Sequence, residues 1–121
     1  MTTQFPIYTT RGDWAAMLFG RYLHNIHGDW IGWVESDGKV FSVRGEYAGW
    51  LSRDFRVLCK RDTTELVPRR RPPPPQPKRE MPVTVPLPPM MGELTFDTID
   101  LFEDAPRRLD PYDMDQIQDI D

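Results

Sequence analysis

The chain has few of the residues that staple a small protein or anchor it in a membrane. It contains one cysteine, Cys59, and two histidines among its 121 residues. A lone cysteine excludes an intramolecular disulfide and is typical of a reducing compartment. No apolar run approaches the roughly 20 residues that a membrane span requires, and the first ten residues lack the regions of a signal peptide. We therefore expect no membrane span and a cytoplasmic protein, most simply a bacterial one.

Aromatic residues and prolines are unevenly distributed along the chain. All four tryptophans precede residue 51, and ten of the 13 prolines lie between residues 65 and 91. The part able to fold is therefore roughly half of the chain, a size at which a single core is marginal. We expect one domain over residues 1–67, a proline-rich basic linker over residues 68–91 and an acidic tail over residues 92–121.

The net charge of −4 hides a gradient along the chain. Residues 1–64 carry eight Lys or Arg against seven Asp or Glu, residues 65–91 carry five against two, and residues 92–121 carry two against ten. A near-neutral domain with an acidic end lacks the basic surface of a nucleic-acid-binding protein. We expect a protein partner and no nucleic acid, and we leave a homo-oligomer open.

A short motif recurs through the first half of the chain. It runs basic residue, Gly, acidic residue, aromatic residue, two small or apolar residues, large apolar residue, aliphatic residue. Three copies begin at Arg11, His27 and Arg44, so their glycines are 16 and 17 residues apart. A fourth, degenerate copy of the motif is expected at Arg61 and Asp62. Such a repeat indicates one supersecondary unit used several times.

Each copy predicts a β-hairpin. A short β-prone run approaches a turn in which glycine can take positive φ, and a second run returns. The returning runs carry apolar residues on both faces, which suits strands that are buried on both sides. The predicted fold is all-β, with four short β-hairpin repeats arranged as a pseudo-fourfold closed flower. A largely disordered proline-rich and acidic tail is expected to follow.

Two segments, residues 25–34 and 43–51, resemble repeats of the bacterial 4-fold β-flower domain family, which have the form Gly-x-x-x-Gly-Trp-aliphatic. The resemblance covers about residues 4–67, and the tail near residues 89–100 is similar to the ends of some members. It implies four hairpin petals around a pseudo-fourfold axis and no established activity. The fourth copy departs from the pattern at Asp62, so the fourth petal is either incomplete or closed by the N-terminal strand.

No catalytic or metal-binding constellation stands out. His24 and His27 are three residues apart, which places them on opposite faces of a strand, and with Cys59 they lack zinc-ligand spacing. No Ser-His-Asp set or Gly-rich phosphate loop is present. We expect no enzyme, no cofactor and no metal, with a hydrolase-like activity at a histidine as a remote alternative. The recurring tryptophans favour core packing over an aromatic ligand cage.

Symmetry of the repeats suggests one candidate site. A closed flower would place four basic residues in equivalent turns, beside a ring of acidic ones: Arg11, His27, Arg44 and Arg61. Turn residues are usually polar because turns are solvated, and the functional alternative is a rim that binds a ligand, an anion or an acidic peptide. The alternative function is therefore a small-ligand or anion-binding module, with its site on the pseudo-fourfold axis or the basic rim.

The linker and the tail carry the leading hypothesis. Arg69-Arg70-Arg71 and the following prolines fit polyproline II, either as an SH3-type ligand or, as we expect, as a stiff spacer that holds the tail away from the domain. Apolar residues recur among the acids of the tail and are the predicted partner-binding residues: Phe96, Ile99, Leu101 and Phe102. We therefore predict a non-enzymatic interaction or adaptor protein whose acidic C-terminal linear motif binds a partner.

Overall fold

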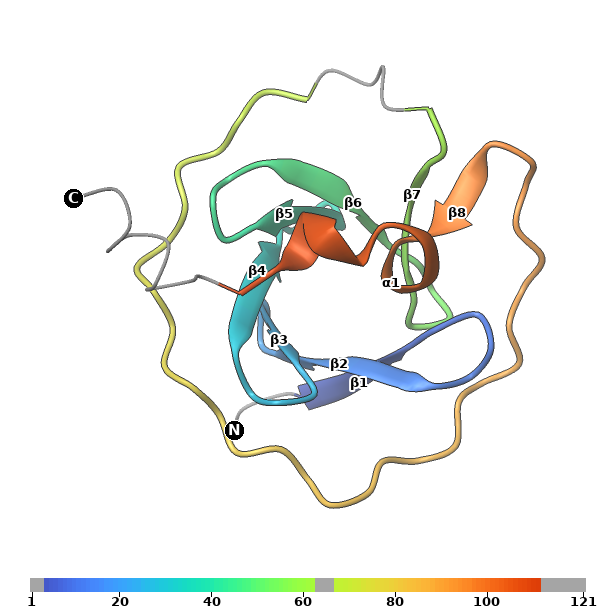
Figure 1. Cartoon of the computed structure of the whole chain (residues 1–121), viewed down its shortest axis with the longest axis horizontal. Helices are drawn as coiled ribbons and strands as arrows, with labels where there is room; N and C mark the ends of the chain where they lie inside the picture. The colour runs from blue at the N-terminus through green and yellow to red at the C-terminus, as the bar shows by residue number, and fades with distance from the viewer. Residues whose placement is uncertain (1–3, 63–66, 112–121) are drawn as a thin grey trace.

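The structure, a computed structural model, describes residues 4–62 and 67–111. Its strands form one curled antiparallel sheet in which each strand pairs with the next along the chain (Figure 1). The strands are β1 (Gln4–Tyr8), β2 (Trp14–Phe19), β3 (Tyr22–Asn25), β4 (Trp30–Val34), β5 (Lys39–Ser42), β6 (Tyr47–Leu51), β7 (Val57–Lys60) and β8 (Thr98–Asp100). Two short helical turns follow, α1 (Leu101–Asp104) and η1 (Pro106–Leu109). The predicted all-β class is confirmed.

Three of the predicted hairpins, β1–β2, β3–β4 and β5–β6, share one turn geometry. In each, the first turn residue donates its backbone N–H to the carbonyl four residues later, at 2.8, 2.9 and 2.8 Å. The glycine at the fourth position of each turn has φ of 92°, 90° or 85°, as a three-residue hairpin loop that ends in a left-handed residue requires. We call these turns tip 1 (residues 9–13), tip 2 (residues 25–29) and tip 3 (residues 42–46).

The fourth hairpin takes its second strand from far along the chain. β7 pairs with β8, and Arg61 donates its backbone N–H to the Asp97 carbonyl at 2.7 Å, the bond that Thr9 makes to Asp13 in tip 1. The connection of this hairpin is the whole stretch between Arg61 and Asp97. Both predicted alternatives for the fourth copy, an incomplete hairpin and closure by the N-terminal strand, were wrong. The repeat spacing points to a nearby return strand and cannot indicate one 36 residues away.

The core inside the curled sheet is filled partly by the C-terminal region. Buried side chains from the strands pack together there: Ile7, Leu18, Leu23, Ile31, Val40, Val57 and Cys59. In Figure 1, α1 lies beside β8 and the red segment that follows it lies over the middle of the curled sheet; Leu101 and Leu109 join this core. Each buried leucine contributes about 1.5–3 kcal/mol through removal of apolar surface from water. The expectation of a largely disordered tail therefore differs from the structure over residues 98–109, because these residues complete the core.

A second apolar cluster holds two of the recurring tryptophans. Trp30 and Trp33 are buried with Phe41 and Val43, and the rings of Trp33 and Phe41 stack with centroids 5.4 Å apart. The predicted core role is confirmed for these two tryptophans. Trp14 and Trp50 are half-buried at the surface.

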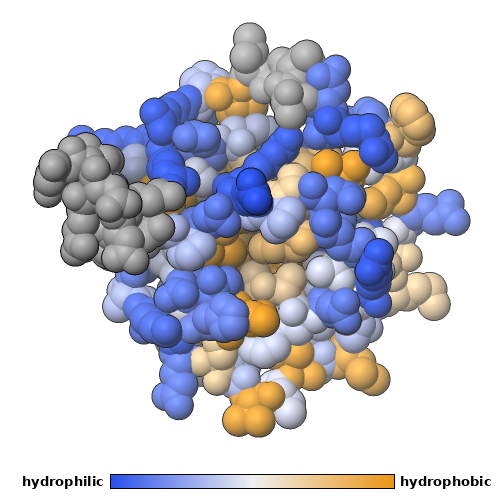
Figure 2. Space-filling model, in the orientation of Figure 1, coloured by the Kyte–Doolittle hydropathy of each residue, from blue (hydrophilic) through white to orange (hydrophobic). Residues whose placement is uncertain are grey.

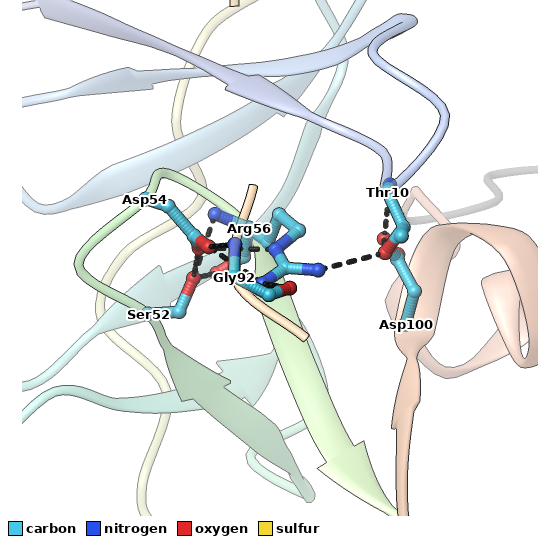
Figure 3. Close-up of polar contacts among 6 residues, drawn as sticks. All are labelled: Thr10, Ser52, Asp54, Arg56, Gly92 and Asp100. Atoms are coloured by element: carbon cyan, nitrogen blue, oxygen red, sulfur yellow. Dashed lines mark hydrogen bonds and ion pairs between the residues drawn. The ribbon is translucent and has the colours of Figure 1, made fainter. Parts of the chain in front are cut away.

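Polar groups join the first hairpin to the fourth (Figure 3). The buried carboxylate of Asp100 accepts hydrogen bonds from the backbone N–H and Oγ1 of Thr10, at 2.6 and 2.7 Å. Arg56, which is 2 % exposed, donates to Thr10 Oγ1 at 3.0 Å and to Asp54 Oδ1 at 3.0 Å. We call the six residues drawn in Figure 3 the clasp: Thr10, Ser52, Asp54, Arg56, Gly92 and Asp100. The clasp links the two ends of the sheet, β1 and β8, through side chains.

Candidate functional site

Residues 67–96 run around the edge of the domain, from the end of β7 back to the start of β8 (Figure 1). We call this segment the belt, with a first half (residues 67–79) and a second half (residues 80–96). Half-buried residues recur along it at steps of three: Pro73, Gln76, Arg79, Pro82, Val85, Pro88, Met91 and Leu94. Three residues per turn is the period of polyproline II. The expected spacer therefore differs from the structure, since the belt lies on the domain instead of projecting from it.

At tip 3 the belt is held by its backbone and by charge. Arg70 donates its backbone N–H to the Gly45 carbonyl at 2.9 Å. Arg69 Nη2 lies 3.2 Å from Glu46 Oε1, and the guanidinium of Arg70 lies 5.8 Å from the centre of the Phe41 ring. The ion pair is exposed and contributes at most about 1 kcal/mol, so its main effect is on the register of the belt.

The backbone hydrogen bond and the ion pair recur at tip 2. Arg79 donates its backbone N–H to the Gly28 carbonyl at 2.9 Å. Lys78 Nζ lies 3.8 Å from Asp29 Oδ1, and the guanidinium of Arg79 lies 4.8 Å from the centre of the Phe19 ring. Tips 2 and 3 therefore hold equivalent belt residues by the same backbone bond and ion pair, whereas the ring beneath the arginine comes from β5 at tip 3 and from β2 at tip 2.

The glycines of these two tips leave space for the belt itself. A Cβ added to Gly28 would lie 2.0 Å from the carbonyl oxygen of Arg79, and one added to Gly45 would lie 1.9 Å from that of Arg70. Glycine is thus required for close approach as well as for positive φ. The recurring glycine predicted the turns, and the structure adds contact with a distant segment as a second reason for it.

His24 lies beneath the belt next to tip 2. It is fully buried, its Nε2 lies 3.3 Å from the Pro77 carbonyl oxygen, and its Nδ1 has no hydrogen-bond partner among the described residues. Burial lowers the pKa of His24, because removal from water disfavours the imidazolium. His24 therefore serves as a neutral contact for the belt, in the place that Tyr8 and Phe41 take in the neighbouring hairpins.

Tip 1 has a looser contact with the belt. The buried Tyr8 hydroxyl donates to the Pro86 carbonyl. A Cβ added to Gly12 would meet Pro88 Cγ at 3.3 Å and nothing closer. Pro88 has no N–H to donate, so the backbone bond found at tips 2 and 3 has no counterpart here.

The three contacts are nine belt residues apart, at positions 70, 79 and 88. The sequence carries a matching repeat: Val67-Pro68-Arg69-Arg70, Gln76-Pro77-Lys78-Arg79 and Val85-Pro86-Leu87-Pro88. Nine residues make three turns of polyproline II, about 28 Å at 3.1 Å per residue. Sequence reasoning missed this repeat, although prolines at 68, 77 and 86 were a signal for it. The nine-residue spacing of these prolines can be interpreted only when the distance between neighbouring tips is known.

The belt ends in the clasp (Figure 3). Gly92 donates its N–H to Asp54 Oδ2 at 3.0 Å, and its carbonyl accepts from Arg56 Nη2 at 2.9 Å. Burial would raise the pKa of Asp54, but hydrogen bonds from Arg56, Ser52 and Gly92 outweigh it and lower the pKa to about 2. The second half of the belt is therefore fixed firmly at its far end.

The predicted basic rim is divided between separate tips. His27 and Arg44 are exposed on tips 2 and 3, which lie nine extended belt residues apart. Arg11 Nε lies 3.8 Å from Glu103 Oε1 of α1. Binding of a ligand or anion by these residues stays a prediction.

Arg61 is not equivalent to the other rim residues. Its backbone bond to Asp97 gives it the place of Thr9 in tip 1, two positions before Arg11. Its Nε donates to the Phe96 carbonyl at 3.1 Å, and its guanidinium lies 5.7 Å from the Phe96 ring centre. Arg61 therefore lies two positions away from the rim position, because the fourth connection has a different length from the tips, and its part in a ligand or anion site stays a prediction.

The predicted partner-binding residues of the tail divide into two groups. Leu101 is fully buried, and Ile99 and Phe102 pack partly buried against the same core. Phe96 is 90 % exposed. Three of the four side chains therefore contact the domain itself, and partner binding through them stays a prediction. Residues 112–121 of the predicted tail lie outside the described residues.

Comparisons of the chain with protein-family models, with curated proteins and with solved structures found no match. Among the described residues, no group of three or more His, Cys, Asp or Glu side chains is placed to hold a metal ion. In the same part of the chain, no helix is long and apolar enough to cross a membrane. The arrangement that the structure offers for function is the belt on its three tips.

Proposed function

We propose that this protein is a non-enzymatic protein-interaction module that presents the second half of its belt as a fixed, extended ligand. The observation that carries the proposal is the exposure of large apolar side chains along this half. Val83 is 98 % exposed, Leu87 92 %, Met90 95 % and Phe96 90 %. Apolar groups lie along the lower and right-hand edges of the molecule, where the second half of the belt runs (Figure 2).

The attachment of the belt supports this function. The second half is held at Arg79 by tip 2 and at Gly92 by the clasp. A segment that is already extended loses less conformational entropy on binding than a free peptide does. Extended proline-rich segments are recognised by apolar, aromatic-lined grooves. We therefore propose a protein partner with such a groove, which would receive Leu87, Met90 and the exposed prolines beside them.

The proposal includes the closed, pseudo-fourfold arrangement of the hairpins. It is supported by the pairing of β7 with β8 as a fourth hairpin and by the bonds from Thr10 to Asp100 that join the first hairpin to the fourth. We place the anion-binding alternative second, because two of its four rim residues already have partners: Arg11 pairs with Glu103, and Arg61 donates to the Phe96 carbonyl.

A comparison of two triple variants tests the function. In the first, Val83, Leu87 and Met90 are each replaced by serine. In the control, nearby exposed polar residues are changed conservatively: Glu80→Gln, Thr84→Ser and Glu93→Gln. Both should unfold at the temperature of the wild type, because the altered side chains are exposed.

Each full-length protein would be used to capture partners from cells of its source, and any captured protein would then be purified and titrated. We expect a partner that binds the wild type and the control equally and the serine variant at least tenfold more weakly. Equal binding of every captured protein to all three chains would overturn the proposal.

A further inference from the structure

Tips 2 and 3 define a small recognition unit for extended chain. The glycine carbonyl accepts an arginine N–H, and the acidic residue after the glycine pairs with the basic residue before that arginine. At tip 2 the strand that leads into the tip also supplies a side chain, His24, that reaches the carbonyl of the preceding proline. The ligand read by this unit is Pro-basic-Arg.

Tip 1 carries the same groups. Gly12 has the same backbone conformation as Gly28, with φ of 92° against 90°. Asp13 follows it, and the Tyr8 hydroxyl reaches a proline carbonyl, that of Pro86. Tip 1 therefore has each of the groups with which tip 2 binds the belt.

The segment that covers tip 1 does not match it. Leu87 stands where tips 2 and 3 meet Lys78 and Arg69, and Pro88 stands where they meet an arginine. Within residues 4–62 and 67–111, no group donates a hydrogen bond to the Gly12 carbonyl, and no basic side chain pairs with Asp13. Two acceptors that are satisfied at the other tips are therefore left without protein partners.

We propose that tip 1 is a binding site for an extended Pro-(Lys/Arg)-Arg segment of a partner protein, which replaces residues 85–88 of the belt there. The arginine N–H of the segment bonds to the Gly12 carbonyl, its preceding basic side chain pairs with Asp13, and its proline carbonyl accepts from Tyr8. Arg11 does not oppose a basic ligand strongly, since Glu103 pairs with it. This site overlaps the exposed apolar row of the proposed function at Leu87, whereas Val83, Met90 and Phe96 lie outside residues 85–88.

The belt segment competes with the ligand because it is tethered at both ends. A tethered competitor acts at an effective concentration of the order of 1 mM. The extra hydrogen bond and ion pair give the matching ligand about a tenfold advantage. We therefore expect an apparent dissociation constant of the order of 0.1–1 mM for a short peptide.

The probe is a synthetic peptide with the sequence of residues 76–82, Gln-Pro-Lys-Arg-Glu-Met-Pro, titrated into the full-length isotope-labelled chain. The control peptide has Leu-Pro in place of Lys-Arg. We expect the amide signals of Gly12 and Asp13 to shift with the first peptide and to stay unchanged with the control. Asp13→Asn should weaken binding at least threefold.

A second variant fills the site from within. Leu87→Lys combined with Pro88→Arg gives the belt its own matching segment at tip 1, and we expect this variant to bind the peptide about tenfold more weakly. The proposal is overturned by any of these results: no shift at 3 mM peptide, equal shifts with the control peptide, shifts confined to tips 2 and 3, or undiminished binding by either variant. The capture experiment on Val83, Leu87 and Met90 does not depend on this outcome.

Discussion

The two halves of the belt follow the same path around the domain but are held in different ways. The first half has two backbone hydrogen bonds to tips, three ion pairs and two arginines over aromatic rings. The second half has one hydrogen bond at tip 1 and then the clasp at Gly92. Its side chains of Val83, Leu87 and Met90 are exposed. The comparison shows how one repeat can be fixed to the domain in one part and presented to a partner in another.

The largest expected effect comes from removing the clasp. Arg56→Leu would leave the half-buried carboxylate of Asp54 without its cation and would remove the hydrogen bonds from Arg56 to Thr10 Oγ1 and the Gly92 carbonyl, and breaking such a pair costs about 3 kcal/mol or more. Chemical denaturation measures the loss. Arg53→Leu is the matched control, because Arg53 is exposed in the same turn, and it should change the free energy of unfolding by less than about 0.5 kcal/mol. Equal stability of the two variants would contradict the role given to the clasp.

Substitution of the tip glycines by alanine should lower stability more at tips 2 and 3, where the belt backbone is close, than at tip 1. Gly28→Ala and Gly45→Ala introduce a Cβ about 2 Å from a belt carbonyl as well as a strained φ, so each should cost about 2–4 kcal/mol. Gly12→Ala meets Pro88 at 3.3 Å, so it should cost only the strain of its φ, about 1–2 kcal/mol. Thermal or chemical unfolding of the three variants checks this order. A Gly12 variant as unstable as the other two would mean that the belt contacts are not different.

Repairing the contact at tip 1 should remove the difference between the halves. Leu87→Lys with Pro88→Arg adds a backbone N–H for the Gly12 carbonyl and a cation for Asp13. One hydrogen bond and one exposed ion pair contribute about 1–2 kcal/mol together, less the loss of proline rigidity, about 0.4–1 kcal/mol. A small net gain in unfolding free energy is expected, and it should vanish when Asp13→Asn is added. A gain that survives that third change would have another source.

Acid should weaken the belt at tip 2 and not at tip 1. The pKa of His24 is lowered in the folded chain by burial, so the unfolded chain binds a proton first as the pH falls below its ordinary value of 6.5. Folding then loses free energy with falling pH, while above 6.5 this group has no effect. The charged groups facing His24 are Arg79, which opposes its protonation, and Asp29, which favours it.

His24→Phe tests this directly, because Phe41 holds the same place in the neighbouring hairpin. The variant should lose the part of the pH dependence of stability that lies just below pH 6.5, as measured by unfolding at several pH values. An unchanged slope would mean that His24 titrates in the folded state as it does in the unfolded one.

The hairpins and their turns were predictable from the sequence because their determinants are local. Gly12, Gly28 and Gly45 fix left-handed turn positions, and the runs around them alternate as strands do. The fourth hairpin was not predictable in this way, since β8 is separated from β7 by the whole belt. Burial of Leu101 and Leu109 depends on the shape of the curled sheet, which no short pattern encodes.

The candidate site was likewise predictable from the sequence only in part. The nine-residue spacing of Pro68, Pro77 and Pro86 is present in the sequence, but it gains meaning from the distance between tips. The aromatic core role of Trp30 and Trp33 followed from their recurrence. The contact of Gly28 and Gly45 with belt carbonyls could not be predicted, because turn conformation alone already explained those glycines.

Hydrogen exchange of individual belt amides tests the central claim most directly. Arg70 and Arg79 donate their N–H groups to the tips, while their neighbours Arg71 and Glu80 donate to no described group. We predict exchange at least about 100-fold slower at Arg70 and Arg79 than at Arg71 and Glu80, because exchange of a bonded amide requires local opening. Fast, uniform exchange at all four amides would show that the belt is not bound to the tips.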